Sequence, residues 1–167
     1  MVDTRLLVIL DDSAAAKRAV RYVGKFVGKR TGFHICLLHV LPPLPSQLLE
    51  HGGSENPAKE ARLGVDLKAE QHRWISAAKK ASQKGLEEAR AILRTAGISA
   101  GTMKALSYEP GENQNAADVI LNMARRSHCR TVVVGRQSVS WFHELFNEQL
   151  SDELLRRGKE FCVWAIE

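Results

Sequence analysis

Short runs of apolar residues, uninterrupted by polar ones, restrict the fold of this chain more than any other feature. Two of them are RLLVIL at residues 5–10 and RTVVVG at residues 130–135. A strand with one face in water would alternate apolar and polar residues, whereas a strand covered on both faces is apolar almost throughout. Such strands are typical of parallel sheets between layers of helices. The sequence therefore predicts a layered α/β fold.

The order of the elements makes this prediction more specific. Strand-like runs alternate with segments of helical periodicity, which predicts a doubly wound five-stranded parallel sheet with helices on both faces and right-handed crossovers. The 167 residues predict one domain, residues 1–167. The strands are expected at 5–10, 33–40, 101–106, 130–135 and 161–166, and the helices at 13–30 (closing near Gly32), 66–96 and 147–157. A further helix is expected within residues 108–128, after a turn, with its apolar side marked by Ala116, Val119, Ile120 and Met123.

The segment from Leu41 to about Gly64 has no apolar period and is rich in proline and glycine. A connection of this length in a compact domain is usually functional or mobile. It leaves the carboxyl end of the second expected strand. We expect an irregular, mobile segment near any cleft at that end, and its role stays open.

Composition and charge restrict the partners. The chain is 44% hydrophobic and 26% charged, and no apolar run approaches the roughly 18 residues of a membrane span, which predicts a cytoplasmic protein without membrane contact. The net charge of +5 invites a nucleic-acid interpretation. However, Lys17, Arg21, Lys25 and Lys29 recur every four residues, as on the solvated face of an amphipathic helix. This spacing argues against a nucleic-acid partner.

The cysteine spacing and a search for known catalytic motifs indicate no metal site, no disulfide framework and no catalytic site. Cys36, Cys129 and Cys162 have neither metal-ligand nor redox spacing, and their odd number argues against a disulfide framework. Cys36 and Cys162 lie in apolar runs, so both are predicted to be buried. Nucleophile-elbow, Walker and dinucleotide glycine motifs are missing from the sequence. We predict no catalytic and no metal-ligating residues, and whether the protein is an enzyme stays open.

Candidate binding residues follow the strands, because ligands of doubly wound sheets bind beyond the carboxyl ends of the strands. Asp11 and Asp12 follow the first strand and could accept hydrogen bonds from a ribose or base, or hold a divalent cation. Alternatively, one of them helps Ser13 to cap the next helix. Both interpretations remain open at this stage.

Several motifs in order resemble one known family. They are LVILDDS in the first strand and turn, LLHV in the second strand, YEPGENQNAADVI before and within the third helix, VVVGRQS in the fourth strand and turn, and then LSDELL and CVWAI. Over essentially its whole length the chain resembles the universal stress protein family. The resemblance implies a Rossmann-like α/β fold and a stress-response or regulatory role.

The resemblance also implies a nucleotide site with an altered phosphate half. ATP-binding members carry glycine, two residues, glycine, nine residues, glycine and then serine or threonine. Gly135 keeps the first glycine, while Ser138, Glu148 and Gln149 stand at the other three positions. The acidic residue associated with the nucleoside and the apolar residue near the adenine are retained. The candidate nucleotide-binding residues are Asp11, Asp12, Ser13, Val40, Gly135, Arg136, Gln137, Ser138, Glu148, Gln149 and Ser151.

Two of the replacements oppose phosphate binding. Ser138 adds a Cβ where the backbone should approach a phosphate. Glu148 adds a carboxylate, and two like charges ~4 Å apart repel by about 4 kcal/mol at an effective dielectric constant near 20. We predict a non-enzymatic regulatory module with at most weak or altered nucleotide binding. The alternative is an ATP- or AMP-binding switch that takes a divalent cation only with the nucleotide.

The last strand suggests self-association. An apolar strand at a sheet edge exposes unpaired backbone groups, which a second copy can pair by continuing the sheet. The resemblance implies such dimers. We predict a homodimer through Phe161, Cys162, Val163, Trp164, Ala165 and Ile166, and the sequence does not identify a further protein partner.

Overall fold

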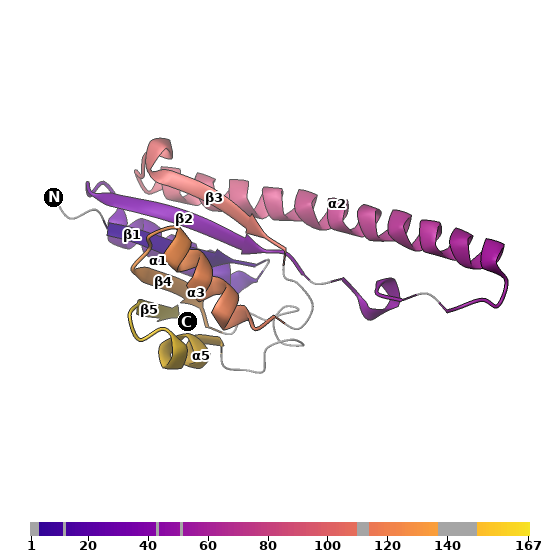
Figure 1. Ribbon diagram of the computed structural model, residues 1–167. Coiled ribbons are helices and arrows are strands. Elements are labelled where there is room, and N and C mark those ends of the chain that lie inside the picture. The colour runs from indigo at the N-terminus through magenta and orange to yellow at the C-terminus, as the bar shows by residue number, and fades with distance from the viewer. Residues whose placement is uncertain (1–3, 12, 43, 51, 110–113, 137–149) are drawn as a thin grey trace.

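The computed structural model describes residues 4–11, 13–42, 44–50, 52–109, 114–136 and 150–167. The strands form one five-stranded parallel sheet of order β3-β2-β1-β4-β5, with β1 at the centre (Figure 1). This confirms the predicted fold class. The strands are β1 (Thr4–Leu10), β2 (Phe33–Val40), β3 (Met103–Tyr108), β4 (Thr131–Gly135) and β5 (Cys162–Ile166).

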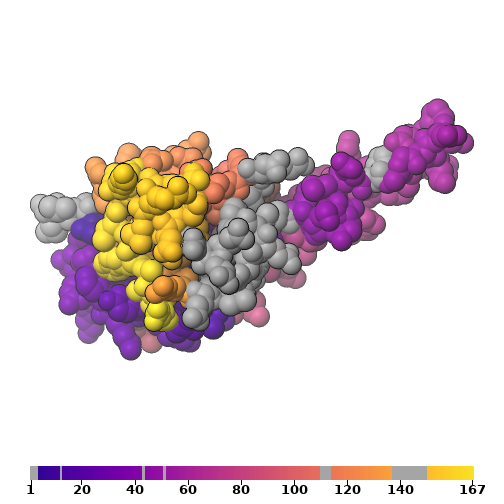
Figure 2. Space-filling view, turned by 90° about the horizontal axis from the view of Figure 1, so that it is seen from below, coloured from indigo at the N-terminus to yellow at the C-terminus, as the bar shows by residue number. Residues whose placement is uncertain are grey.

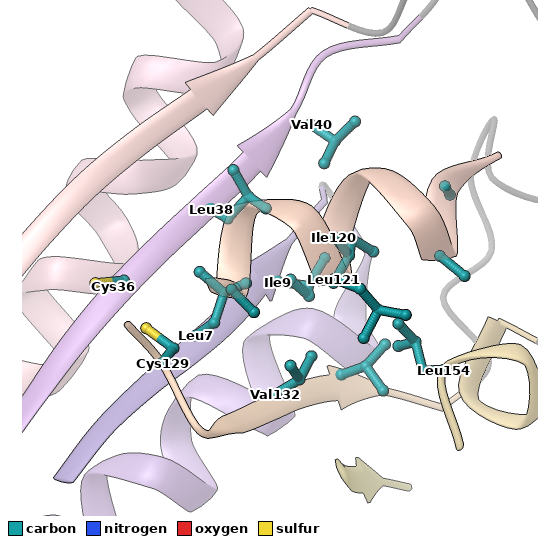
Figure 3. Packing of buried hydrophobic residues seen from close by; sticks show 14 residues of the cluster. Leu7, Ile9, Cys36, Leu38, Val40, Ile120, Leu121, Cys129, Val132 and Leu154 are labelled. Carbon is teal, nitrogen blue, oxygen red and sulfur yellow. The ribbon is translucent and has the colours of Figure 1, made fainter. Parts of the chain in front are cut away.

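Helices cover both faces of the sheet, as the apolar strands require. Alternate strand residues face two separate cores, because successive side chains of a strand point to opposite faces. Leu7 and Ile9 pack with α3 and α5 in one core (Figure 3), and Leu6 and Val8 pack with α1 and α2 in the other. The helices are α1 (Ala14–Val27), α2 (Pro57–Thr95), α3 (Ala116–Arg126) and α5 (Leu150–Arg157), and the 3-10 turns are η1 (Ser46–Leu48) and η2 (Ala100–Thr102).

Helix α1 begins as the sequence predicts and ends earlier. Ser13 caps its start, with the hydroxyl oxygen accepting a hydrogen bond from Ala16 N at 3.1 Å. The helix ends at Val27 rather than near Arg30, because Gly28 takes a positive φ of 50° at the C-cap. Glycine adopts this conformation without the steric cost of a Cβ.

The prediction of an irregular segment up to Gly64 was wrong for its last part. Helix α2 begins at Pro57, not near Asp66. The Asn56 side chain accepts hydrogen bonds from Ala58 N at 3.0 Å and Lys59 N at 3.4 Å. A proline at the first helical position needs no N–H partner and already has a helical φ. The proline that resembled a helix breaker is therefore the helix start.

Helix α2 has two halves with different surroundings. Its 39 residues span about 58 Å at 1.5 Å per residue, longer than the sheet it packs on. Its buried residues, Ser82, Leu86, Ala89 and Leu93, all lie in the second half. Figure 2 shows the first half and the chain before it extending away from the rest of the molecule. No described helix is long and apolar enough to cross a membrane.

We expect Leu93→Ala to lower the free energy of unfolding by about 2–5 kcal/mol, because Leu93 is fully buried between the sheet and α1 and its loss leaves a cavity. Val65→Ala, in the projecting half of the same helix where Val65 is 68% exposed, should change it by less than about 0.5 kcal/mol. Urea denaturation measures both. Equal effects of the two substitutions would contradict the division of α2 into a packed and a projecting half.

Candidate functional site

The carboxyl ends of β1 and β4 form the candidate site. Chain connections leave the centre of the sheet in two directions: β1 leads to β2 on one side, while β3 leads across to β4 on the other. The strand order therefore reverses between β1 and β4, and such reversals are where open α/β sheets bind ligands. Asp11 follows β1 directly and Arg136 follows β4 directly, so the structure brings these two predicted site residues to the same edge.

Asp11 is engaged in the turn that starts α1. Its Oδ1 accepts a hydrogen bond from Ser13 N at 2.9 Å, and Ser13 in turn caps the helix. This is the capping alternative that the sequence left open, and it applies to Asp11. The second carboxylate oxygen is not used by that bond, and Asp11 remains partly exposed. Asp11 thus shapes the turn and still offers an acceptor to the edge of the sheet.

Gly135 has a packing role that the sequence did not reveal. It is the last residue of β4, and the first turn of α1 passes directly over it. A Cβ on Gly135 would lie 2.5 Å from the backbone carbonyl carbon of Ala15 and 2.8 Å from Ala16 N. No side chain fits there without moving α1. The retained glycine is required by the contact between helix and strand, whether or not a phosphate binds.

Arg136 is paired with the end of the chain. Its Nη1 lies 2.8 Å from Oε1 of Glu167, and the Arg136 backbone N donates to Ile166 O. The register of β4 with β5, which pairs Gly135 with Ile166, places the two residues side by side. Both side chains are more than half exposed, so this ion pair is weak and a bound anion could compete for the guanidinium.

Of the remaining predicted site residues, the structure describes only Val40 and Ser151 in addition to Ser13. Val40, at the end of β2, is only 2% exposed and packs in the core with Ile9, so it forms the floor of this edge rather than an open surface. Ser151 lies in the first turn of α5 and is partly exposed. The other candidates lie outside the described residues: Asp12, Gln137, Ser138, Glu148 and Gln149.

A pocket of about 220 Å³ opens beside Asp11, between α1 and the packed half of α2. Lys17 and Glu88 line it and form an ion pair with 3.0 Å between Nζ and Oε2. The hydrogen bond and charge of Lys17 lower the pKa of Glu88. Lys84 also lines the pocket. The volume of this pocket is small compared with the several hundred Å³ of ordinary ligand sites.

A polar cluster beneath the site joins α3 to α5, and the sequence gave no sign of it. Asn115 caps α3 and also donates from Nδ2 to Glu153 Oε2 at 3.2 Å. Arg157 pairs with Asp118 at 3.0 Å and with Glu153 at 3.0 Å. Hydrogen bonds from Arg156 and then Asn115 lower the pKa of Glu153. These contacts fix the direction in which α5, and with it Ser151, leaves the edge of the sheet.

One of the two burial predictions for the cysteines was wrong. Cys36 is buried as predicted, whereas Cys162, on the edge strand β5 of the described chain, is exposed. Cys129, just before β4, is buried against the same core as Cys36. Among the described residues, no three His, Cys, Asp or Glu side chains lie close enough to hold a metal ion.

The strand order, the reversal between β1 and β4 and the turn after β4 define a doubly wound α/β protein of the open-sheet class. Within that class the chain belongs to the universal stress protein family, since the profile described as "Universal stress protein family" matches residues 4–105. A search of curated proteins gave no match.

Solved structures with the same fold have low sequence identity to this chain. A universal stress protein family member from Burkholderia pseudomallei has 16% identity and a TM-score of 0.64, with 98% of this chain and 96% of that chain covered. One from Archaeoglobus fulgidus in complex with dAMP has 15% identity and a TM-score of 0.54, with 100% of both chains covered. One from Arabidopsis thaliana with AMP bound has 19% identity and a TM-score of 0.58, covering 98% and 90%.

Because the backbone of Ala15 lies so close to Gly135, we expect Gly135→Ala to destabilise the protein by about 1–3 kcal/mol or more, through displacement of α1. Gly101→Ala is the matched control, since a Cβ there would meet nothing closer than 3.9 Å. Thermal unfolding compares the two variants. A fully stable Gly135→Ala protein would show that the glycine is not retained for packing.

Proposed function

We propose that this universal stress protein is a non-enzymatic regulatory module whose nucleotide binding is weak or altered. The observation that carries the proposal is that the retained motif residues serve the fold itself. Gly135 admits the first turn of α1, and Asp11 accepts a hydrogen bond from Ser13 N. Their retention therefore needs no bound phosphate, and the other three glycine-motif positions hold Ser138, Glu148 and Gln149.

A nucleotide switch is the second candidate, and the similar structures favour it. Two of them hold dAMP or AMP, which carry a single phosphate. An adenosine monophosphate needs less of a phosphate cradle than ATP does, and Asp11 and Val40 stand at the positions associated with the nucleoside. In this alternative the ligand is a monophosphate, and a divalent cation enters only with a longer phosphate chain.

Calorimetry with ATP, AMP and adenosine, each with and without Mg²⁺, separates the two candidates. The proposal expects ATP to bind no better than adenosine, because Glu148 repels phosphate. Glu148→Gly should then strengthen ATP binding by about tenfold to a thousandfold, as removal of up to 4 kcal/mol of repulsion implies, and leave adenosine binding unchanged.

Glu144→Gly is the matched control, since it removes the same charge from the same segment at a position outside the glycine motif. It should leave all three affinities unchanged. Tight ATP binding by the natural protein that Glu148→Gly does not strengthen would refute the repulsion argument. Magnesium-independent AMP binding much tighter than that of adenosine would support the switch instead.

We also propose that two copies pair through β5. This strand lies at the edge of the sheet and is bonded only to β4 in the described chain. Trp164 is half buried, with its ring 4.8 Å from Phe26 and 6.3 Å from Tyr22 between ring centroids. Phe26 and Tyr22 are 41% and 48% exposed, so aromatic surface lies beside an open strand edge. A second copy of the chain would pair the open edge of β5 and cover the exposed aromatic rings beside it.

The backbone directions of β5 give a selective test. Cys162 N donates inward to Arg130 O at 2.9 Å, so the N–H of Val163 points outward, since residues alternate along a parallel strand. Val163→Pro should therefore spare the bonds to β4 and abolish dimerisation, whereas Val163→Ala should leave the dimer intact. Sedimentation should give twice the chain mass of 18.6 kDa for the natural protein and for Val163→Ala. A stable natural monomer at micromolar concentration would refute the dimer.

We further propose that residues 1–167 act as one domain. The cytoplasmic location and the lack of a nucleic-acid partner remain predictions from the sequence, and the protein partner is not identified.

A further inference from the structure

Two buried cysteines, 93 positions apart in the chain, lie together near the amino ends of the strands. Cys36 is the fourth residue of β2 and is 6% exposed, and Cys129 lies in the connection from α3 to β4 and is 1% exposed. Both residues belong to the same buried cluster, and their sulfur atoms lie at the same end of it (Figure 3).

The turn before β4 holds Cys129 in this position. The Cys129 backbone N donates to Ala124 O at 2.9 Å, and its Sγ lies 3.7 Å from Ser127 O. The residue before it, His128, has a φ of 55° and is the non-glycine residue with positive φ in the described chain. Left-handed backbone is uncommon for a residue with a Cβ. The turn therefore holds Cys129 in the core at some conformational cost.

Cys36 also lines a pocket of about 230 Å³ at the opposite end of the sheet from the candidate nucleotide site. Arg5, Lys104 and Arg126 line the same pocket, and the described lining residues include no carboxylate. His34 and His128 also line it. A small polar molecule that enters this pocket lies beside Cys36 in a surrounding of positive charge.

The surroundings favour a thiolate on Cys36. The neighbouring Cys129 thiol, followed by the charges of Lys104 and Arg5, lowers the pKa of Cys36 to about 7 despite the opposing effect of burial. The neighbouring Cys36 and burial raise the pKa of Cys129. Near neutral pH a substantial fraction of Cys36, a lining residue of the pocket, is therefore thiolate, while Cys129 keeps its proton. The thiolate is the nucleophilic form of cysteine.

Simple packing does not explain this arrangement. Two cysteines that only filled space would need neither a cationic surrounding nor access from a pocket. A metal site is not supported either, because among the described residues no group of three suitable ligands lies together. A thiolate next to a second thiol, beside an opening to solvent, has the parts needed for oxidation followed by disulfide formation.

We propose that Cys36 is a peroxide-reactive thiol and that Cys129 is its resolving partner. The Cys36 thiolate attacks one oxygen of hydrogen peroxide, the O–O bond breaks, and the departing hydroxide takes up a proton to become water. Cys36 is then a sulfenic acid. Cys129 loses its proton and attacks the Cys36 sulfur, the S–O bond breaks, and a second water leaves. The two thiols supply two electrons, and a disulfide joins β2 to the start of β4.

Peptide mapping tests the proposal directly on the full chain. The protein is treated with a small excess of hydrogen peroxide at neutral pH, alkylated, and digested with trypsin without reduction. Trypsin places Cys36 in residues 31–59, Cys129 in residues 127–130 and Cys162 in residues 160–167. The expected product is residues 31–59 joined to residues 127–130, lighter than the two free peptides by two hydrogens and separated by a reducing agent. Cys162→Ser removes the exposed thiol and should give the same product.

Two variants separate the roles of the thiols. In Cys129→Ser, Cys36 should stop at the sulfenic acid and become labelled by dimedone, while in Cys36→Ser the thiol of Cys129 should react at least tenfold more slowly. Lys104→Gln should slow the oxidation of Cys36 severalfold, and Lys80→Gln, on the exposed face of α2, should not. The proposal is overturned if Cys36 stays reduced while Cys162 is oxidised, or if Cys36 is oxidised without joining Cys129.

Discussion

The position of β1 between β2 and β4 is the constraint on which the rest of the structure depends. Parallel partners on both edges and helices on both faces bury this strand from Leu6 to Leu10, and Leu6, Leu7 and Val8 are fully buried. Only apolar residues are stable in such surroundings, because a buried polar side chain without a partner costs free energy. The same position creates the reversal in strand order, so one strand determines both the core and the site.

The two ends of the sheet have different chemistry. At the carboxyl end, polar groups next to the strands are already hydrogen bonded or paired: Asp11 with the start of α1 and Arg136 with Glu167. At the amino end, Arg5 and Lys104 lie beside a buried thiol pair and raise the local positive potential. The two ends are separated by the length of the strands, and their pockets share no described lining residue.

In helix α2 the signals for a helix start and the packing against the sheet lie in different halves. Its first half follows good start signals, Asn56 and Pro57, but has no buried residue to hold it on the sheet. Hydrogen bonds to the preceding chain partly replace the missing apolar contacts of this half. The Glu60 carboxylate accepts a hydrogen bond from Ser54 N at 2.6 Å, and Gln71 donates to Leu48 O at 2.7 Å. These polar contacts tie Leu48 and Ser54 to the helix.

The sequence alone determined the sheet, the helices and the family, because apolar strands and helix caps depend on neighbouring residues. It also determined which chemical groups occupy the glycine-motif positions. Tertiary structure decided what those groups contact: Gly135 is kept by the backbone of Ala15, a contact between segments about 120 residues apart that no local pattern encodes. It likewise placed Cys36 and Cys129 in one core and left Cys162 exposed, since sequence spacing reports neither proximity across the core nor which side chains of a strand the helices leave uncovered.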